Sequence, residues 1–469
     1  MWASARGGSQ FTQLIEGSRM LLHQLPRLVP AVVLCVAMCR PVLAIQTDDG
    51  LKDRLQDEHA EDADHWVYND IEAARVIAKN QDKPMFVTFR CVPCRDCKSF
   101  DAEVANGSNV IKEFAKKEFV SVRQVEMKGV DLSQFQFDCD LNWAAMFINA
   151  DGTVYGRYGT QSAKGPDAYN SVEGLKATME RVLKLHANYP ANKRELEYKR
   201  GKPKPYKTAM EMPGLPPTWK RLKGTTTRKN CIHCHMIHDA EHEHAAKSGT
   251  FKKDMLWRYP LPENIGITID PKNGRKVIKS SIVPEGSEVS HINGQAITSI
   301  ADIQWALHNL PNERVLISVT TVTQHTYTRP GSQSPSGTVE VPSKIGFLTK
   351  PGWKKTDISW RGSIFSVSPG FNVWCPPLPP KKREALGLDD KQPALEVRWI
   401  NNGKPGGRAA AQSGLREGDV IIEVAGKPVP PKDQKFQTLI KLNYKAGDML
   451  PLTVLRKGER QTINVKLVD

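Results

Sequence analysis

Two short segments combine cysteine and histidine at spacings that could do chemistry. The first reads CVPCRDC over residues 91–97, and the second reads CIHCH over residues 231–235. A thiolate is both a nucleophile and a soft metal ligand, and two nearby cysteines can close a disulfide. Redox chemistry, metal binding and haem attachment are therefore the functions that these segments favour.

The first segment lies where a strand is expected to end and a helix to begin. Residues 85–89 (MFVTF) are typical of a buried strand, and residues 99–104 follow a helical pattern. The N-terminus of a helix offers free N–H groups and partial positive charge, which lower a thiol pKa from about 8.5 toward about 7. A second thiol three residues further on can resolve a mixed disulfide. This position therefore predicts thiol–disulfide exchange.

Alternating strands and helices surround this segment and predict an α/β layer over residues 60–188. The layer resembles the thioredoxin superfamily, in which a strand aromatic stands five positions before the first active cysteine, and Phe89 sets that register. The resemblance implies that Cys94 is the catalytic nucleophile and Cys97 the resolving thiol. The expected helices are 70–80, 109–117 and 171–187, and the expected strands are 85–89, 119–125, 145–149 and 153–158.

Three features keep other interpretations of this segment open. Cys91 is a third thiol, and a Cys91–Cys94 pair is the competing register. The family places a cis-proline opposite its active thiols, but here the matching position holds Trp143. With Cys139 as a fourth ligand, the thiols could instead bind a soft metal, or they could close a structural disulfide.

The second segment carries the C-x-x-C-H pattern of c-type haem attachment. It resembles the cytochrome c family over these five residues. The resemblance implies that Cys231 and Cys234 bond to the haem and that His235 is the proximal iron ligand. The expected distal ligand is one of His238, His242 and Met255.

Zinc is the alternative occupant of the same segment. Cys231, Cys234, His238 and His242 could form a tetrahedral site, because histidines four residues apart share one face of a helix. A disulfide between the two cysteines is the third alternative. The sequence leaves haem, zinc and disulfide open.

The C-terminal part of the chain resembles bacterial PDZ domains. Residues 408–426 match the family core, residues 434–442 are the expected groove helix, and the whole domain is expected over 381–469. Leu386, Gly387 and Leu388 resemble the carboxylate-binding loop, whose N–H groups capture the C-terminus of a protein or peptide. Residues 261–345 resemble a degenerate PDZ module, and residues 346–380 are expected to form a β-rich insert without chemistry.

The first 44 residues have the features of a secretory signal. A basic region precedes a short apolar run, and the small residues up to Ala44 suit cleavage. We therefore expect an exported, periplasmic or extracytoplasmic protein that has no transmembrane helix after cleavage. In such an oxidising compartment, thiols tend to form disulfides, bind ligands or perform redox work.

The net charge of +15 is concentrated in two segments that lie outside the expected domains. The signal carries +3 and residues 193–229 carry +9, which leaves +3 for the rest of the chain. Prolines and this charge predict that residues 189–260 form an extended basic linker around the C-x-x-C-H motif. The nearly neutral domains argue against nucleic acid as a partner.

Together these patterns predict a multidomain protein, with an α/β thioredoxin-like domain, a basic linker and two mainly-β PDZ-like modules. The favoured function is an exported thiol–disulfide oxidoreductase that binds client proteins through its PDZ modules and exchanges with redox partner proteins, with c-type haem as the favoured cofactor and zinc as the alternative. The alternative is a non-enzymatic PDZ scaffold or a haem- or metal-dependent sensor, in which the thioredoxin fold only binds a partner.

Overall fold

The computed structural model describes residues 49–57, 65–92, 98–107, 109–216, 225–328, 330 and 337–469. The predicted signal at 1–44 lies outside these residues, and the described elements all belong to the unit Ile45–Asp469. Within the described part of the chain, no helix is both long and apolar enough to cross a membrane.

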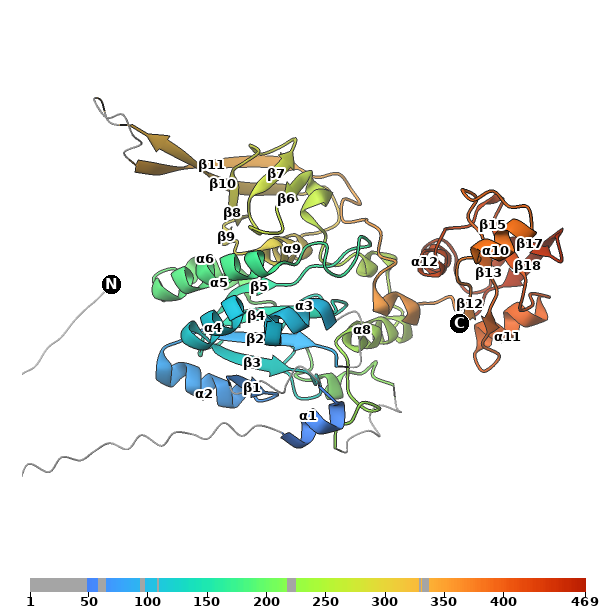
Figure 1. Ribbon diagram of the computed structural model, residues 1–469, viewed down its shortest axis with the longest axis horizontal. Coiled ribbons are helices and arrows are strands. Elements are labelled where there is room, and N and C mark those ends of the chain that lie inside the picture. Colours follow the sequence, from blue (N-terminus) through green and yellow to red (C-terminus); the bar gives the residue numbers. More distant parts are fainter. Residues whose placement is uncertain are drawn as a thin grey trace, which may run out of the picture. The chain divides into compact units, whose positions relative to one another are not determined.

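A five-stranded sheet forms the first layer, in the order β1-β3-β2-β4-β5 (Figure 1). The first three of these strands in space are parallel, and β4 and β5 run antiparallel to their neighbours. Every residue of the five strands is buried, as expected for a sheet covered on both faces. The strands are β1 (Trp66–Tyr68), β2 (Met85–Arg90), β3 (Val120–Gln124), β4 (Trp143–Ile148) and β5 (Val154–Tyr158).

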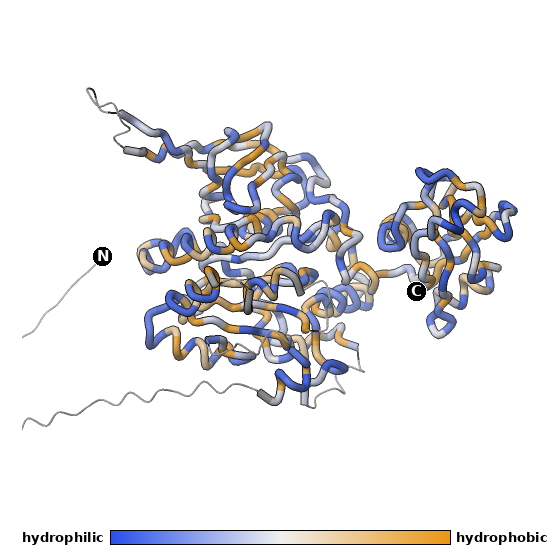
Figure 2. Tube along the Cα trace, in the orientation of Figure 1, coloured by the Kyte–Doolittle hydropathy of each residue, from blue (hydrophilic) through white to orange (hydrophobic). Residues whose placement is uncertain are grey.

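Helices cover both faces of this sheet, and Figure 2 shows orange and blue alternating along them. One face packs against α2 (Ile71–Gln81) and α8 (His235–Lys247), and the other against α3 (Lys98–Ala102), α4 (Asn109–Glu118) and α5 (Val172–Ala187). A short π-helix, η2 (Glu103–Gly107), follows α3, and α1 (Asp49–Leu55) precedes the sheet. Asp70 caps α2 as expected, because its Oδ1 accepts a hydrogen bond from the Ala73 amide at 2.8 Å.

Residues 189–216 and 225–260, the described part of the expected linker, are packed onto this layer rather than extended. The segment contains α6 (Lys193–Leu196), η3 (Glu197–Lys199), η4 (Ala209–Glu211), α8 and η5 (Lys253–Leu256). Its apolar side chains Ala209, Met212, Leu215, Ile232 and Ile237 belong to the core on one face of the sheet. Proline and charge content did not predict this, because apolar residues at irregular spacing supply the packing.

Antiparallel strands build the next part of the chain around a separate core. The four-stranded sheet has the order β11-β10-β8-β9, and β6 pairs with β7 beside it. The elements are η6 (Pro262–Ile265), β6 (Ile267–Ile269), β7 (Val277–Ser280), β8 (Glu288–Ile292), β9 (Gln295–Ala296), α9 (Ile300–His308), β10 (Leu316–Tyr327) and β11 (Gly337–Leu348). The degenerate PDZ module expected here stays a prediction.

The C-terminal module holds a sheet in the order β13-β15-β17-β18, with β16 paired to β15, and a separate β12-β14 pair. Its core includes Phe371, Val373 and Cys375, so part of the segment expected as an insert contributes to this module. The elements are η7 (Gly362–Ser366), β12 (Val373–Trp374), α10 (Pro380–Ala385), β13 (Leu395–Glu396), β14 (Trp399–Ile400), α11 (Pro405–Gln412), β15 (Val420–Val424), β16 (Lys427–Pro428), α12 (Asp433–Asn443), β17 (Met449–Arg456) and β18 (Glu459–Lys466).

Candidate thiol site

The thiol segment begins where the sequence places it, at the end of a central strand. β2 ends at Arg90, Cys91 follows, and α3 begins at Lys98. Cys94 and Cys97, the predicted catalytic pair, lie outside the described residues. Cys91 is therefore the thiol of this segment whose surroundings can be described.

Cys91 contacts the second cysteine segment directly. Its Sγ lies 2.5 Å from Nδ1 of His233, a residue 142 positions away in the chain. Burial, and then the neighbouring His235, lower the pKa of His233, so its imidazole is neutral at pH 7. A neutral imidazole nitrogen can accept the proton of a thiol, and this contact therefore joins a nucleophile to a base.

The other two thiols of the C-x-x-C-H segment are buried. Cys231 packs among Leu51, Leu55, Tyr68, Val92 and Val125, and Cys234 belongs to the core beneath α8. Burial raises the pKa of both thiols, and Glu126 and Cys91 add to the effect at Cys231. Both thiols are therefore protonated at neutral pH in this arrangement.

Backbone contacts hold the C-x-x-C-H segment against the strand end next to the thiols. The Met127 amide donates to the Ile232 carbonyl at 3.3 Å, and the Ile232 amide donates to Glu126 Oε1 at 3.1 Å. Cys231 Sγ lies 3.5 Å from the Val125 carbonyl. The segment is thereby fixed beside the residues that follow the C-terminal end of β3.

A buried ion network supports the stem of the thiol segment. Arg90 and Arg123, at the ends of β2 and β3, pair with Asp57 and with Asp101 of α3 at 2.5–3.1 Å. The Tyr68 hydroxyl also donates to Asp57 at 3.2 Å. This network was not predicted from the sequence. Its signal in the sequence is an arginine at the end of one buried strand, Arg90, and another next to the end of a second, Arg123. The network ties the strand before the thiols to the helix after them.

The residues predicted to hold a haem lie in a different arrangement. His235 begins α8, and its Nδ1 lies 3.2 Å from Asp239 Oδ2. A Cβ added to Gly362 would lie 3.4 Å from the His235 ring, so the chain at 362 lies against one side of that ring, and the His235 side chain is 44% exposed. Cys231 and Cys234 are 6% and 7% exposed and face different apolar clusters. A haem bonded to both thiols would have to displace that packing, and the described residues do not fit it in this conformation.

The predicted distal and zinc ligands are also engaged elsewhere. His238 Nδ1 lies 3.0 Å from Asp140 Oδ2, and Met255 lines a cleft with Tyr206 and His244. His242 is buried with neither ring nitrogen hydrogen-bonded. Within the described ranges, the ligand atoms that lie close enough together for a metal belong to a different set, namely Asp138, Asp140 and His238.

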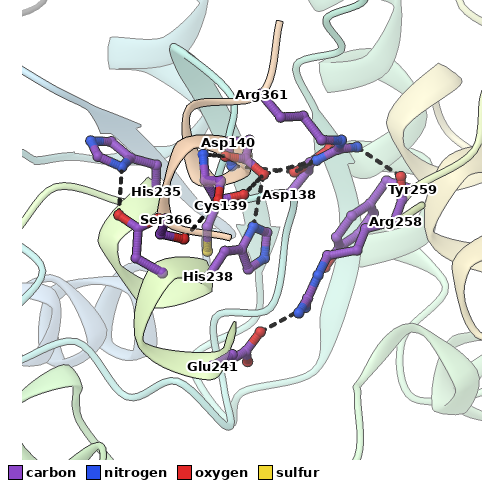
Figure 3. Close-up of polar contacts among 12 residues, drawn as sticks. Asp138, Cys139, Asp140, His235, His238, Glu241, Arg258, Tyr259, Arg361 and Ser366 are labelled. Carbon is purple, nitrogen blue, oxygen red and sulfur yellow. Dashed lines mark hydrogen bonds and ion pairs between the residues drawn. The ribbon is translucent and has the colours of Figure 1, made fainter. Parts of the chain in front are cut away.

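Both carboxylates of that set are already paired with an arginine (Figure 3). Arg361 contacts Asp138 at 2.7 Å and Asp140 at 3.1 Å, and the amide and hydroxyl of Ser363 both donate to Asp140. Burial alone would raise the pKa of Asp140, but His238 and Arg361 hold it well below its usual range. These contacts make the cluster a paired ion network that joins segment 361–363 to segment 138–140.

Trp143 occupies the position where the thioredoxin resemblance leads one to expect proline. It is the first residue of β4, pairs with Arg90 across the sheet and is buried. Its ring meets Phe100 of α3 edge to face, with centroids 5.0 Å apart. The indole therefore packs beside the stem of the thiol segment.

The predicted carboxylate-binding loop does not line the cleft found in the C-terminal module. Leu386 and Leu388 follow α10 and pack against an apolar cluster that includes Val420 and Ile422. The cleft instead lies between β12 and α12, where Phe371, Val373 and Gln437 are among its lining residues. The alternating apolar residues Phe371, Val373 and Cys375 were the sequence signal for strand β12, which lines this cleft.

Family models match two parts of the chain. The thioredoxin-like model matches residues 66–150, and the PDZ domain model matches residues 395–467. The chain contains a thioredoxin-like domain and a PDZ domain. The thioredoxin-like domain carries Cys91 at the end of β2, and the PDZ domain implies peptide binding.

Two solved structures of the HtrA-type protease AlgW resemble part of the chain. The one with a decapeptide is 17% identical, has a TM-score of 0.19 and aligns over 33% of this chain and 49% of that chain. The one with a tripeptide is 14% identical, has a TM-score of 0.20 and aligns over 32% of this chain and 60% of that chain. The chain thus spans about half to three-fifths of their length. No curated protein matches it.

Proposed function

We propose that the protein is an exported thiol–disulfide redox protein whose PDZ domain holds a client peptide near its thioredoxin-like domain. The contact between Cys91 and His233 carries this proposal, because it brings the two cysteine segments into one thiol site. The thioredoxin resemblance supplies the roles of Cys94 and Cys97, and the PDZ match supplies the peptide-binding role.

The proposed reaction is an exchange of two electrons between this site and a client disulfide. A thiolate of Cys94 attacks one client sulfur, the client S–S bond breaks, and the departing client thiolate takes up a proton. Cys97 then attacks the mixed disulfide, which leaves a Cys94–Cys97 disulfide and a reduced client. His233 accepts the proton of Cys91, so that Cys91 can serve as a further thiolate in the same site.

Reduction of insulin disulfides by the mature chain tests the enzymatic part. The Cys94→Ser/Cys97→Ser variant should lose the activity, and a Cys375→Ala variant should keep it, because Cys375 lies in the PDZ core. Equal activity of the wild type and the double variant would reject thiol–disulfide catalysis at this pair.

The second candidate is a scaffold or a haem- or metal-dependent sensor that performs no exchange. Trp143 in place of the family proline favours it. A visible spectrum of the chain made with haem-maturation machinery, together with its zinc content, separates the alternatives. A Soret band would establish haem, and one equivalent of zinc with no Soret band would establish a zinc site.

Export is part of the proposal and has its own test. Cleavage after Ala44 would give a mature chain that begins at Ile45. N-terminal sequencing of the protein recovered from the periplasm of a producing cell should find this residue. Recovery of the full-length chain in the cytoplasm alone would reject export.

A further inference from the structure

The cleft of the PDZ domain is lined by β12 and α12 together with Phe365 of η7, Trp399 of β14 and Asn401. Its volume is about 220 Å³. On its far side, β12 pairs with β14: the amide of Asn401 donates to the Asn372 carbonyl, and the amide of Arg398 donates to the Trp374 carbonyl. Because successive residues of a strand direct their backbone groups to opposite edges, residues 373 and 375 present theirs to α12.

Side chains of α12 already hold those backbone groups. Gln437 Nε2 donates to the Val373 carbonyl at 2.7 Å, and Asp433 Oδ1 accepts from the Cys375 amide at 3.1 Å. Gln437 also donates to Asp433 at 3.3 Å. Both side chains lie on one face of α12, since they are four residues apart.

A third residue continues the same face of the helix. Lys441 Nζ donates to the Val367 carbonyl at 2.5 Å and to the Pro369 carbonyl at 3.2 Å. Gln437 and Lys441 are 7% and 4% exposed, so these contacts are shielded from water. Side chains at positions 433, 437 and 441 therefore cover the chain from 367 to 375.

A peptide that joins a sheet as an added strand needs the free backbone groups of the edge strand. We propose that Asp433 and Gln437 form a latch, because they occupy the backbone groups along one edge of β12. An extended client peptide then pairs with β12 only after these two side chains release the Val373 carbonyl and the Cys375 amide. The inference rests on the peptide-binding part of the proposed function and is independent of the thiol chemistry.

Exposed aromatic side chains at the cleft indicate the kind of peptide that fits. Phe365, Trp374 and Trp399 line the cleft, and each is about half exposed, at 49%, 53% and 52%. Aromatic side chains of this size contribute large apolar contact areas at peptide interfaces. The client segment is therefore an extended peptide with apolar side chains.

Peptide selection on the full mature chain tests the latch. Random decapeptides displayed on phage are selected against the Gln437→Met variant, which keeps the length of the side chain and loses its donor. The Kd of the selected peptide is then measured for each variant by fluorescence anisotropy. Loss of one buried hydrogen bond should tighten binding about tenfold relative to the wild type. Asp433→Ala should also lower the Kd, and it replaces Gln437→Met in the selection if that variant does not fold.

Gln434→Met is the matched control, because Gln434 is exposed on the same helix. Its Kd should equal that of the wild type. A wild type that binds as tightly as Gln437→Met would overturn the latch and leave peptide binding in place. Selection of no decapeptide by either latch variant would overturn peptide binding, and the latch with it.

Discussion

Two neighbouring parts of one segment, the residues 231–234 and the helix α8 that follows them, lie in opposite electrostatic surroundings. At its start, His233 meets Cys91 and both partners can be neutral, while Cys231 and Cys234 are buried among apolar side chains. Five residues on, His238 lies in a network of paired ions with Asp140 and Arg361. The paired network is suited to holding segments together, and the neutral thiol–imidazole contact is suited to moving a proton.

Breaking the paired network should have the largest effect on stability. Arg361→Ala would leave Asp138 and Asp140 buried without their cation, and loss of one partner of a buried pair costs about 3–5 kcal/mol. Urea unfolding should show this loss. Arg460→Ala is the control, since its pair with Glu423 is exposed and its loss should leave stability nearly unchanged. Equal losses for both variants would contradict the comparison.

Lowering the pH should weaken the same region through His242. Burial, and then the charges of Arg258 and His238, lower the pKa of His242 to about 4, while Asp140 and Glu241 oppose this shift. The unfolded chain takes up this proton below about pH 6.5, so the stabilising contribution is present above that pH and is lost as the pH falls toward 4.

The measurement is the difference between unfolding free energies at pH 7 and pH 5. His242→Asn should reduce this difference by about 2 kcal/mol relative to the wild type, because the variant has no such proton to take up. Any loss of stability that the substitution causes equally at both pH values cancels in this difference. An unchanged difference would show that His242 does not titrate in this way.

Removing the base of the thiol contact should have a kinetic effect and little effect on stability. In His233→Ala, Cys91 loses the group that accepts its proton, and its alkylation by iodoacetamide at pH 7 should slow about tenfold. His244→Ala, in the helix α8 that follows His233, is the control and should leave the rate unchanged. Peptide mapping by mass spectrometry follows Cys91 by itself, and equal rates in all three proteins would contradict the role of His233.

The sequence predicted those features that depend on neighbouring residues. Strand β2, helix α2 with its Asp70 cap, and the PDZ core around Val420–Val424 follow from local patterns of apolar and capping residues. The thioredoxin-like and PDZ domains were confirmed by the family models. The predicted roles of Cys94 and Cys97 stay predictions.

The features that the sequence did not reveal join residues far apart in the chain. Cys91 and His233 are separated by 142 positions, and Arg361 and Asp138 by 223. Helix α8 is rich in histidine and charge, so it lacks the apolar stripe that would have predicted its packing on the sheet. The cleft of the PDZ domain likewise depends on residues 371–375, which precede the recognisable core by some thirty positions.

Cross-linking of the two cysteine segments tests the central claim most directly. In the Cys94→Ser/Cys97→Ser background, His233→Cys would place a new thiol where the imidazole now meets Cys91. Mild oxidation should then join the peptide that contains Cys91 to the peptide that contains position 233, and mass spectrometry should detect the link. Absence of this link, with Cys91 fully alkylated afterwards, would contradict a single thiol site built from both segments.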